Sequence, residues 1–190
     1  MDSTFNREAL GTAAGAESES ETRDALYHRV AVEHAAALTR IAAAYEADPH
    51  RRPDLLQDIY FTVWTSLAKF AGECSLRTWV YRVAHNTAVT YVVRERRHRS
   101  RALYDLDELE RHPDVFDSER AADEAQIVAR LEQLIQKLKP LDRQIIVLHL
   151  EGVKPVEIAS ISGLSAGNVA TKVHRLRGLL ARHFNVEISP

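Results

Sequence analysis

Residues 154–184, KPVEIASISGLSAGNVATKVHRLRGLLARHF, have the pattern of a short helix, a tight turn and a longer basic helix. Pro155 is acceptable in the first turn of the short helix, and Gly163 supplies the turn. Ser165 is expected to cap the second helix by accepting from its free backbone amides. Two helices that meet at such a corner, the second of them basic, are a common device for placing a helix in the DNA major groove.

The second helix of this corner separates into two faces at 100° per residue. One face is an apolar stripe expected to be buried: Val169, Val173, Leu176 and Leu180. The other face, about 120° away, is polar and cationic, and His174 lies at its edge. It consists of Asn168, Thr171, Lys172 and Arg175. Such a face suits phosphates and base edges, although an amphipathic helix that only caps a bundle would show the same stripe.

Composition sets the class of protein. The chain has 190 residues, enough for one large or two small domains, and only six prolines and seven glycines, as expected of an all-helical protein. Its single cysteine, Cys74, excludes an internal disulfide framework and fits a reducing cytoplasm. No apolar run approaches the roughly 20 residues that span a bilayer, so no membrane insertion and a cytoplasmic location are expected.

The formal net charge of −2 conceals a strong segregation of charge. Residues 105–124 hold nine acids, whereas residues 94–101 hold five arginines and a single acid, Glu95. Local fields of this kind can bind nucleic acid without a basic total.

The chain is predicted to be all-α: two small helical domains joined by a flexible acidic linker, the C-terminal one with a helix-turn-helix. Residues 1–24 are expected to form a disordered acidic tail and residues 102–124 the linker. The two domains are expected over residues 25–101 and 125–186. A long helix is predicted from about residue 76 to residue 97.

Polar and aromatic residues near this long helix are candidates for binding single-stranded nucleic acid. Phe70 precedes the helix, Arg82 and Asn86 lie one turn apart on it, and an arginine cluster follows. An aromatic ring with a nearby amide and guanidinium can stack on and hydrogen-bond an unpaired base. Spacing alone favours the plainer alternative, in which Phe70 fills a core and Arg82 is a solvated surface charge.

Two longer segments resemble a known family. The run PDLLQDIYFTVWTSLAKFAGECSLRTWVYRVAHNTA resembles the second conserved region of the bacterial RNA polymerase sigma-70 family, and EGVKPVEIASISGLSAGNVATKVHRLR resembles its fourth region. The resemblance covers about residues 25–101 and 125–184. The short acidic tether leaves no room for a third helical domain. In this respect the chain resembles the extracytoplasmic-function (ECF) subfamily.

The resemblance implies roles for three sets of residues. Those expected to contact core RNA polymerase are Asp54, Leu55, Leu56, Gln57, Asp58 and Tyr60. Those expected at a flipped base of the −10 promoter element and its phosphates are Ser66, Phe70, Arg82, Asn86, Arg94, Arg96 and Arg97. Those expected at the −35 element are Thr171, Lys172, His174 and Arg175, with Ser165, Asn168 and Arg177 on its phosphates.

The implied function is promoter selection: binding of core RNA polymerase, recognition of the −10 and −35 elements, strand opening and transcription initiation. The expected partners are core RNA polymerase and promoter DNA, and an anti-sigma factor is a further candidate that no single residue specifies. The alternative is a stand-alone helix-turn-helix transcriptional regulator. No catalytic residue, metal ligand or cofactor is expected, because no HExxH pair or glycine-rich phosphate loop is present.

The sequence departs from the family pattern at two places. Arg51 and Arg52 precede the polymerase-contact segment, where many members carry acids. Ala170 stands in the recognition helix where many members have a basic residue, so the family's −35 preference does not carry over to this chain.

Overall fold

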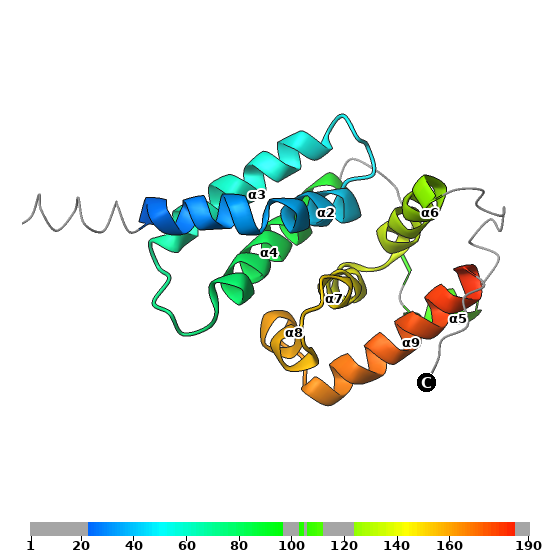
Figure 1. Ribbon diagram of the computed structural model, residues 1–190. Helices are drawn as coiled ribbons and strands as arrows, with labels where there is room; N and C mark the ends of the chain where they lie inside the picture. Colours follow the sequence, from blue (N-terminus) through cyan, green and yellow to red (C-terminus); the bar gives the residue numbers. More distant parts are fainter. Residues whose placement is uncertain (1–22, 97–102, 105, 112–123, 185–190) are drawn as a thin grey trace, which may run out of the picture.

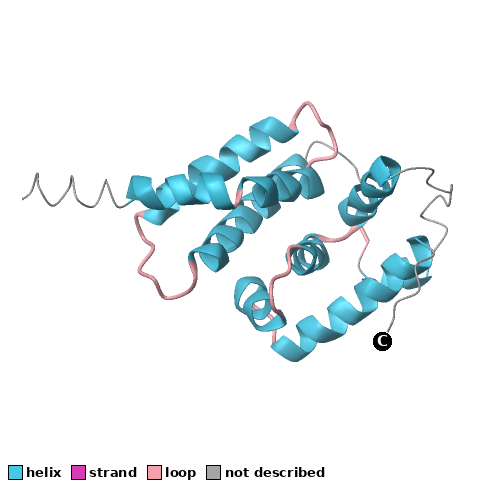
Figure 2. Cartoon of the chain, in the orientation of Figure 1, coloured by secondary structure: helices cyan, strands magenta, loops and turns pink. Residues whose placement is uncertain are grey.

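The computed structural model describes residues 23–96, 103–104, 106–111 and 124–184, and within these ranges the regular structure is helical (Figures 1 and 2). The exception is an isolated bridge between Tyr104 and Leu138. The all-α prediction is therefore confirmed.

The N-terminal half is built from three long helical segments. Residues 23–33 are helical and continue, after a bend at His34, into α2 (Ala35–Tyr45). They pack with α3 (Arg52–Leu67) and α4 (Leu76–Arg96). Pro53 stands in the first turn of α3, where its missing amide hydrogen costs nothing. The core between these helices is aliphatic: Leu38, Ile41, Leu55, Ile59, Val63, Val80 and Ala84.

The C-terminal half contains α6 (Glu124–Lys137), α7 (Pro140–Leu150), α8 (Pro155–Ser162) and α9 (Ala166–Phe184). The corner between α8 and α9 forms as the sequence predicts. Gly163 ends α8 with a φ of 75°, a left-handed conformation that glycine adopts without strain. Ser165 caps α9, because its Oγ accepts from the backbone amide of Asn168 at 3.2 Å.

Part of the expected linker packs against the C-terminal half. Helix α5 (Leu106–Arg111) contacts α9, and its Leu106 and Leu109 are each only 1% exposed. Tyr104 donates its backbone N–H to the carbonyl of Lys137 and accepts from the amide of Lys139, both at 2.8 Å. Two leucines three residues apart thus make one apolar helical face inside an acidic segment. The expected tail falls almost wholly outside the described residues.

The two halves lie side by side in one compact arrangement (Figure 1). Helix α2 contacts α6 and α7, and α4 contacts α7 and α8. Buried apolar side chains from both halves belong to one continuous cluster. The sequence did not indicate this contact, because residues that meet across it are 74 to 111 positions apart in the chain.

Candidate nucleic-acid interface

Helix α9 presents a polar face to solvent. Val169, Val173 and Leu176 of the expected stripe are buried, and Leu179 joins them in place of the half-buried Leu180. The exposed side chains are those of Ser165, Asn168, Thr171, His174 and Arg177, whereas Arg175 is half-buried. The face carries hydroxyl, amide and cationic groups that can meet phosphates and base edges.

Lys172 has a different environment from the rest of this face. Its Nζ lies 2.6 Å from Oδ1 of Asp142 in the first turn of α7. Only 4% of the Asp142 side chain is exposed, so the carboxylate relies on this ion pair and on the α7 N-terminus. Lys172 was expected at the −35 element, but the structure places it in a contact that fixes α9 on α7.

A cleft of about 490 Å³ opens between α3 and α4. It brings together three residues expected at the −10 element: Ser66, Asn86 and Arg94. Asp58, expected to contact polymerase, lines it as well. Asn86 and Arg94 are exposed, so an amide and a guanidinium are free of the core on the same side of α4.

Tyr91 closes one side of this cleft. Its hydroxyl donates to Oε2 of Glu46 at 2.5 Å. Burial first, and then the Glu46 carboxylate, raise the pKa of Tyr91, so the hydroxyl stays protonated and keeps this bond. Tyr91 therefore acts as a rigid wall between the cleft and the core.

Phe70 does not line the cleft. Its ring packs against Trp79 with centroids 5.5 Å apart and an interplanar angle of 55°. Trp79 in turn donates Nε1–H to Oγ of Ser66 at 3.1 Å. Phe70 thus joins the cleft only indirectly, through Trp79 and Ser66, and it is half-buried rather than exposed.

Arg82 also lies away from the cleft, although it is one turn from Asn86. Its Nη2 donates to Oγ of Ser160 in α8 at 3.0 Å. The sequence could not show this, because the partner belongs to the other half of the chain. Arg96 has no described side chain, and Arg97 lies outside the described residues.

The outward side of α3 carries the residues expected to contact polymerase. Asp54, Gln57 and Asp58 are exposed, and Leu56 and Tyr60 are half-buried. Leu55 is 0% exposed, so the expectation that it contacts polymerase is wrong in this conformation: its side chain fills the core between helices. The i, i+3, i+4 spacing that selects Asp54, Gln57 and Asp58 also selects Phe61, which is 66% exposed and which the sequence analysis overlooked.

Comparison with known proteins identifies the family. The model of sigma-70 region 2 matches residues 31–98, and that of sigma-70 region 4 matches residues 129–180. The RNA polymerase sigma factor YlaC of Bacillus subtilis is 30% identical over 129 residues, which cover 65% of this chain and 72% of YlaC. This chain belongs to the sigma-70 family. The ECF RNA polymerase sigma-E factor of Escherichia coli, 30% identical over 66% of this chain and 69% of its own length, places it in the ECF group.

Solved structures show the same fold. CnrH, in complex with the cytosolic domain of CnrY, aligns with a TM-score of 0.61 and 21% identity over 91% of this chain and 96% of CnrH. The sigma factor RpoE in complex with the anti-sigma factor NepR from Bartonella quintana aligns with a TM-score of 0.63 and 19% identity, over 85% of this chain and 98% of RpoE.

The family sets the biochemical role. The protein is an ECF sigma factor, which binds core RNA polymerase and directs promoter recognition. Among the described residues, no helix is both long and apolar enough to cross a membrane, and no cluster of three or more potential ligands for a metal ion is found.

Proposed function

We propose that the α3–α4 cleft receives a base extruded from the −10 element and so drives strand opening. The observation that carries the proposal is the convergence of Asn86, Arg94 and Ser66 on one open cleft. An amide both donates and accepts, which suits the Watson–Crick edge of an unpaired base. A guanidinium at the mouth suits the adjacent phosphate. Together they offset an unstacking cost of a few kcal/mol.

We further propose that the exposed face of α9 reads the −35 element. Thr171, His174 and Arg175 would meet base edges, and Ser165, Asn168 and Arg177 would meet phosphates. The outward side of α3, with Asp54, Gln57, Asp58 and Phe61, would dock on core polymerase. Recognition of two elements at once then requires that polymerase hold the two halves apart.

Three broader proposals follow from family membership. The protein works in the bacterial cytoplasm, where core polymerase and promoters are found. It supplies binding energy and positioning rather than chemistry of its own, so it is not an enzyme. An anti-sigma factor is proposed as a further partner, supported by the two structural neighbours, each solved with a partner protein.

Asn86→Ala tests the cleft. We expect the variant to bind core polymerase normally but to reduce open-complex formation about tenfold or more, because an amide contact worth about 1.5 kcal/mol to a single base is lost. Permanganate reactivity of unpaired thymines measures opening, and pull-down of core polymerase measures docking. Thr90→Ala is a matched control, because Thr90 lines the same cleft but donates its hydroxyl to the Asn86 carbonyl. Equal opening by the Asn86→Ala variant and the wild type would contradict the proposal.

A further inference from the structure

Glu151, the residue that follows α7, is held by two arginines of the N-terminal half. Arg40 of α2 donates Nε–H and Nη2–H to the two carboxylate oxygens of Glu151, at 2.5 and 2.7 Å. Arg77 of α4 donates to the backbone carbonyl of Glu151. Only 8% of the Glu151 side chain is exposed, and a cation at the end of α7 faces the negative end of the helix dipole. Two parallel bonds to one carboxylate fix orientation as well as distance.

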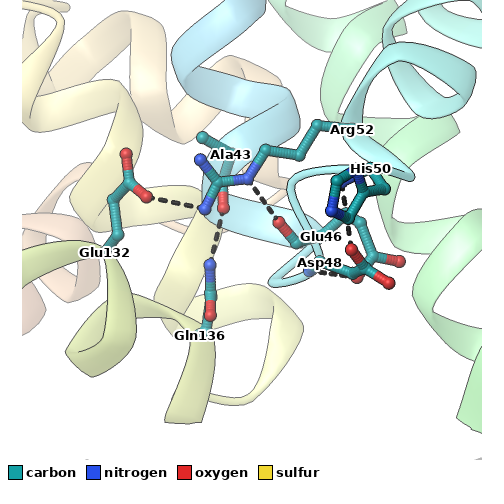
Figure 3. Close-up of polar contacts among 7 residues, drawn as sticks. All are labelled: Ala43, Glu46, Asp48, His50, Arg52, Glu132 and Gln136. Atoms are coloured by element: carbon teal, nitrogen blue, oxygen red, sulfur yellow. Dashed lines mark hydrogen bonds and ion pairs between the residues drawn. The ribbon is translucent and has the colours of Figure 1, made fainter. Parts of the chain in front are cut away.

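A second polar contact joins the halves at α6 (Figure 3). Arg52 donates Nε–H to the carbonyl of Glu46 at 3.0 Å within its own half and Nη2–H to Oε2 of Glu132 at 2.8 Å across the contact. Beside it, Gln136 donates Nε2–H to the carbonyl of Ala43 at 2.8 Å. The guanidinium of Arg52 is therefore oriented by one half and presented to the other.

A third set of contacts joins α4, which lines the cleft, to α8, the first helix of the helix-turn-helix. Arg82, expected at the −10 element, bonds to Ser160 of α8, and Thr78 Oγ1 lies 3.4 Å from Oε1 of Glu157. On α7, the guanidinium carbon of Arg143 lies 5.1 Å from the ring centre of Tyr45 of α2. The first helix of the helix-turn-helix thus rests on the helix that carries the cleft.

The closed arrangement is too small to serve both promoter elements. Elements centred about 25 base pairs apart, as their names state, are separated by about 85 Å along a straight duplex at about 3.4 Å per pair. A compact chain of 190 residues has a radius of gyration of about 16 Å. Helix α9 and the α3–α4 cleft therefore cannot occupy both elements while the halves remain in contact.

We infer that the Arg40–Arg77–Glu151 contact, with Arg52–Glu132, is an internal latch that keeps the free sigma factor closed, with Arg82 held on Ser160 of α8, until polymerase separates the halves. In this closed state the C-terminal half is docked on the N-terminal half of the same chain. The latch is built from ion pairs, so dissolved salt weakens it: the screening length falls from about 10 Å at 0.1 M to about 3 Å at 1 M. The consequence for promoters rests on the proposed function, whereas the closure does not.

The test measures the distance between the halves in the full-length free protein. Cys74→Ser removes the native cysteine, and Lys69→Cys with Arg182→Cys places one dye at an exposed position on each half. Single-molecule energy transfer is then recorded at rising NaCl concentration. We expect one high-transfer population at low salt and a growing low-transfer population toward 1 M.

Arg40→Ala should raise the ratio of open to closed molecules about tenfold at low salt, the loss expected for one charge-assisted contact. Arg29→Ala is the matched control, because Arg29 pairs with Glu33 inside the first helical segment and does not cross the contact. Arg40→Glu should open the molecule further, and adding Glu151→Lys to it should restore part of the closed population. Circular dichroism checks that each variant is folded.

Core polymerase supplies a second readout. If only the open state binds, the Arg40→Ala variant should associate with core polymerase faster than wild type, up to the same factor of about ten. Low transfer in the wild type at low salt, or identical distributions for the Arg40→Ala and Arg29→Ala variants, would overturn the latch. A chain that closes and opens as expected but never supports promoter-specific transcription would leave the latch standing and overturn the proposed function.

Discussion

At the scale of single residues, the same helix face contains side chains with opposite tasks. Thr171, His174 and Lys172 are neighbours on α9, yet Lys172 turns toward the buried Asp142 carboxylate while the other two face solvent. Helical spacing places residues on a face but does not report what a long side chain reaches. A basic residue in a recognition helix can therefore be part of the helix's own support.

Lys172→Met should destabilise the protein by about 2 kcal/mol, because it leaves the Asp142 carboxylate buried without its cation. Urea unfolding measures the loss. Arg177→Met, which removes an exposed cation from the same helix, should change stability by less than about 0.5 kcal/mol. Adding Asp142→Asn to Lys172→Met should recover part of the loss. A Lys172→Met variant as stable as wild type but defective on −35 DNA would instead make Lys172 a DNA contact.

His85 is the residue whose protonation the fold most restricts. It is 0% exposed, and its Nδ1 lies 3.1 Å from the hydroxyl of Tyr45. Burial lowers the pKa of His85 to about 3. The unfolded chain, with an ordinary histidine pKa near 6.5, therefore binds a proton that the folded chain rejects between pH 6.5 and 3. The stabilisation is complete above pH 6.5 and is lost as the pH falls through this window.

Between pH 6.5 and pH 5, His85 should cost the wild type about 2 kcal/mol of unfolding free energy, at roughly 1.4 kcal/mol per pH unit. The measurement is urea unfolding at several pH values, compared with His85→Gln. The variant has a lower stability overall but a shallower pH slope. Because the two proteins differ only at position 85, equal slopes would show that His85 is not the group responsible.

At the scale of elements, the packing of α5 on α9 limits how far apart the two halves can move. While α5 stays on α9, only residues 97–102 separate the described parts of the two halves, and six residues reach at most about 20 Å. If α5 leaves α9, the connection is residues 97–123 and can reach about 90 Å. Promoter spacing therefore favours release of α5 from α9.

Leu109→Ala should detach α5 without unfolding its surroundings. The substitution removes a buried leucine worth about 2–5 kcal/mol, and a helix of six residues is not stable alone. Hydrogen exchange should show loss of protection at residues 106–111 and unchanged protection in α2, α3 and α4. Glu108→Ala, which breaks a surface pair with Lys139, should leave α5 protected. If residues 106–111 of the Leu109→Ala variant were protected as in the wild type, this account would be contradicted.

Elements differ in how well the sequence predicts them, because some are fixed by neighbouring residues and others by contacts between residues far apart in the sequence. The α8–α9 corner follows from Gly163, Ser165 and the apolar stripe, all local signals. The surroundings of α4 do not follow from local signals, because His85 contacts α2 and Arg82 contacts α8. The acidic stretch that contains α5 was expected to be a linker. Its two leucines are buried only by packing on α9, and the local sequence does not show this contact.

At the scale of the whole molecule, the two small halves stabilise each other. Each half alone is in the size range where a hydrophobic core is marginal, and the buried cluster runs through both. Three of the residues that line the cleft, Ser66, Asn86 and Arg94, were expected near the −10 element from the family resemblance, and Asn86 and Arg94 lie eight positions apart on one helix. The closed state is not predictable in this way, since its ion pairs join residues with no local relation.

The ionic part of the contact makes the cooperativity of unfolding depend on salt. At about 0.05 M NaCl, calorimetry should show one thermal transition, because the halves stabilise each other. At about 1 M NaCl, where charges are screened within about 3 Å, we expect two transitions, one for each half. Arg40→Ala should show both transitions already at low salt, whereas Arg29→Ala should keep one. A single transition at every salt concentration in all three proteins would mean that the apolar cluster alone couples the halves and that the arginines are dispensable for it.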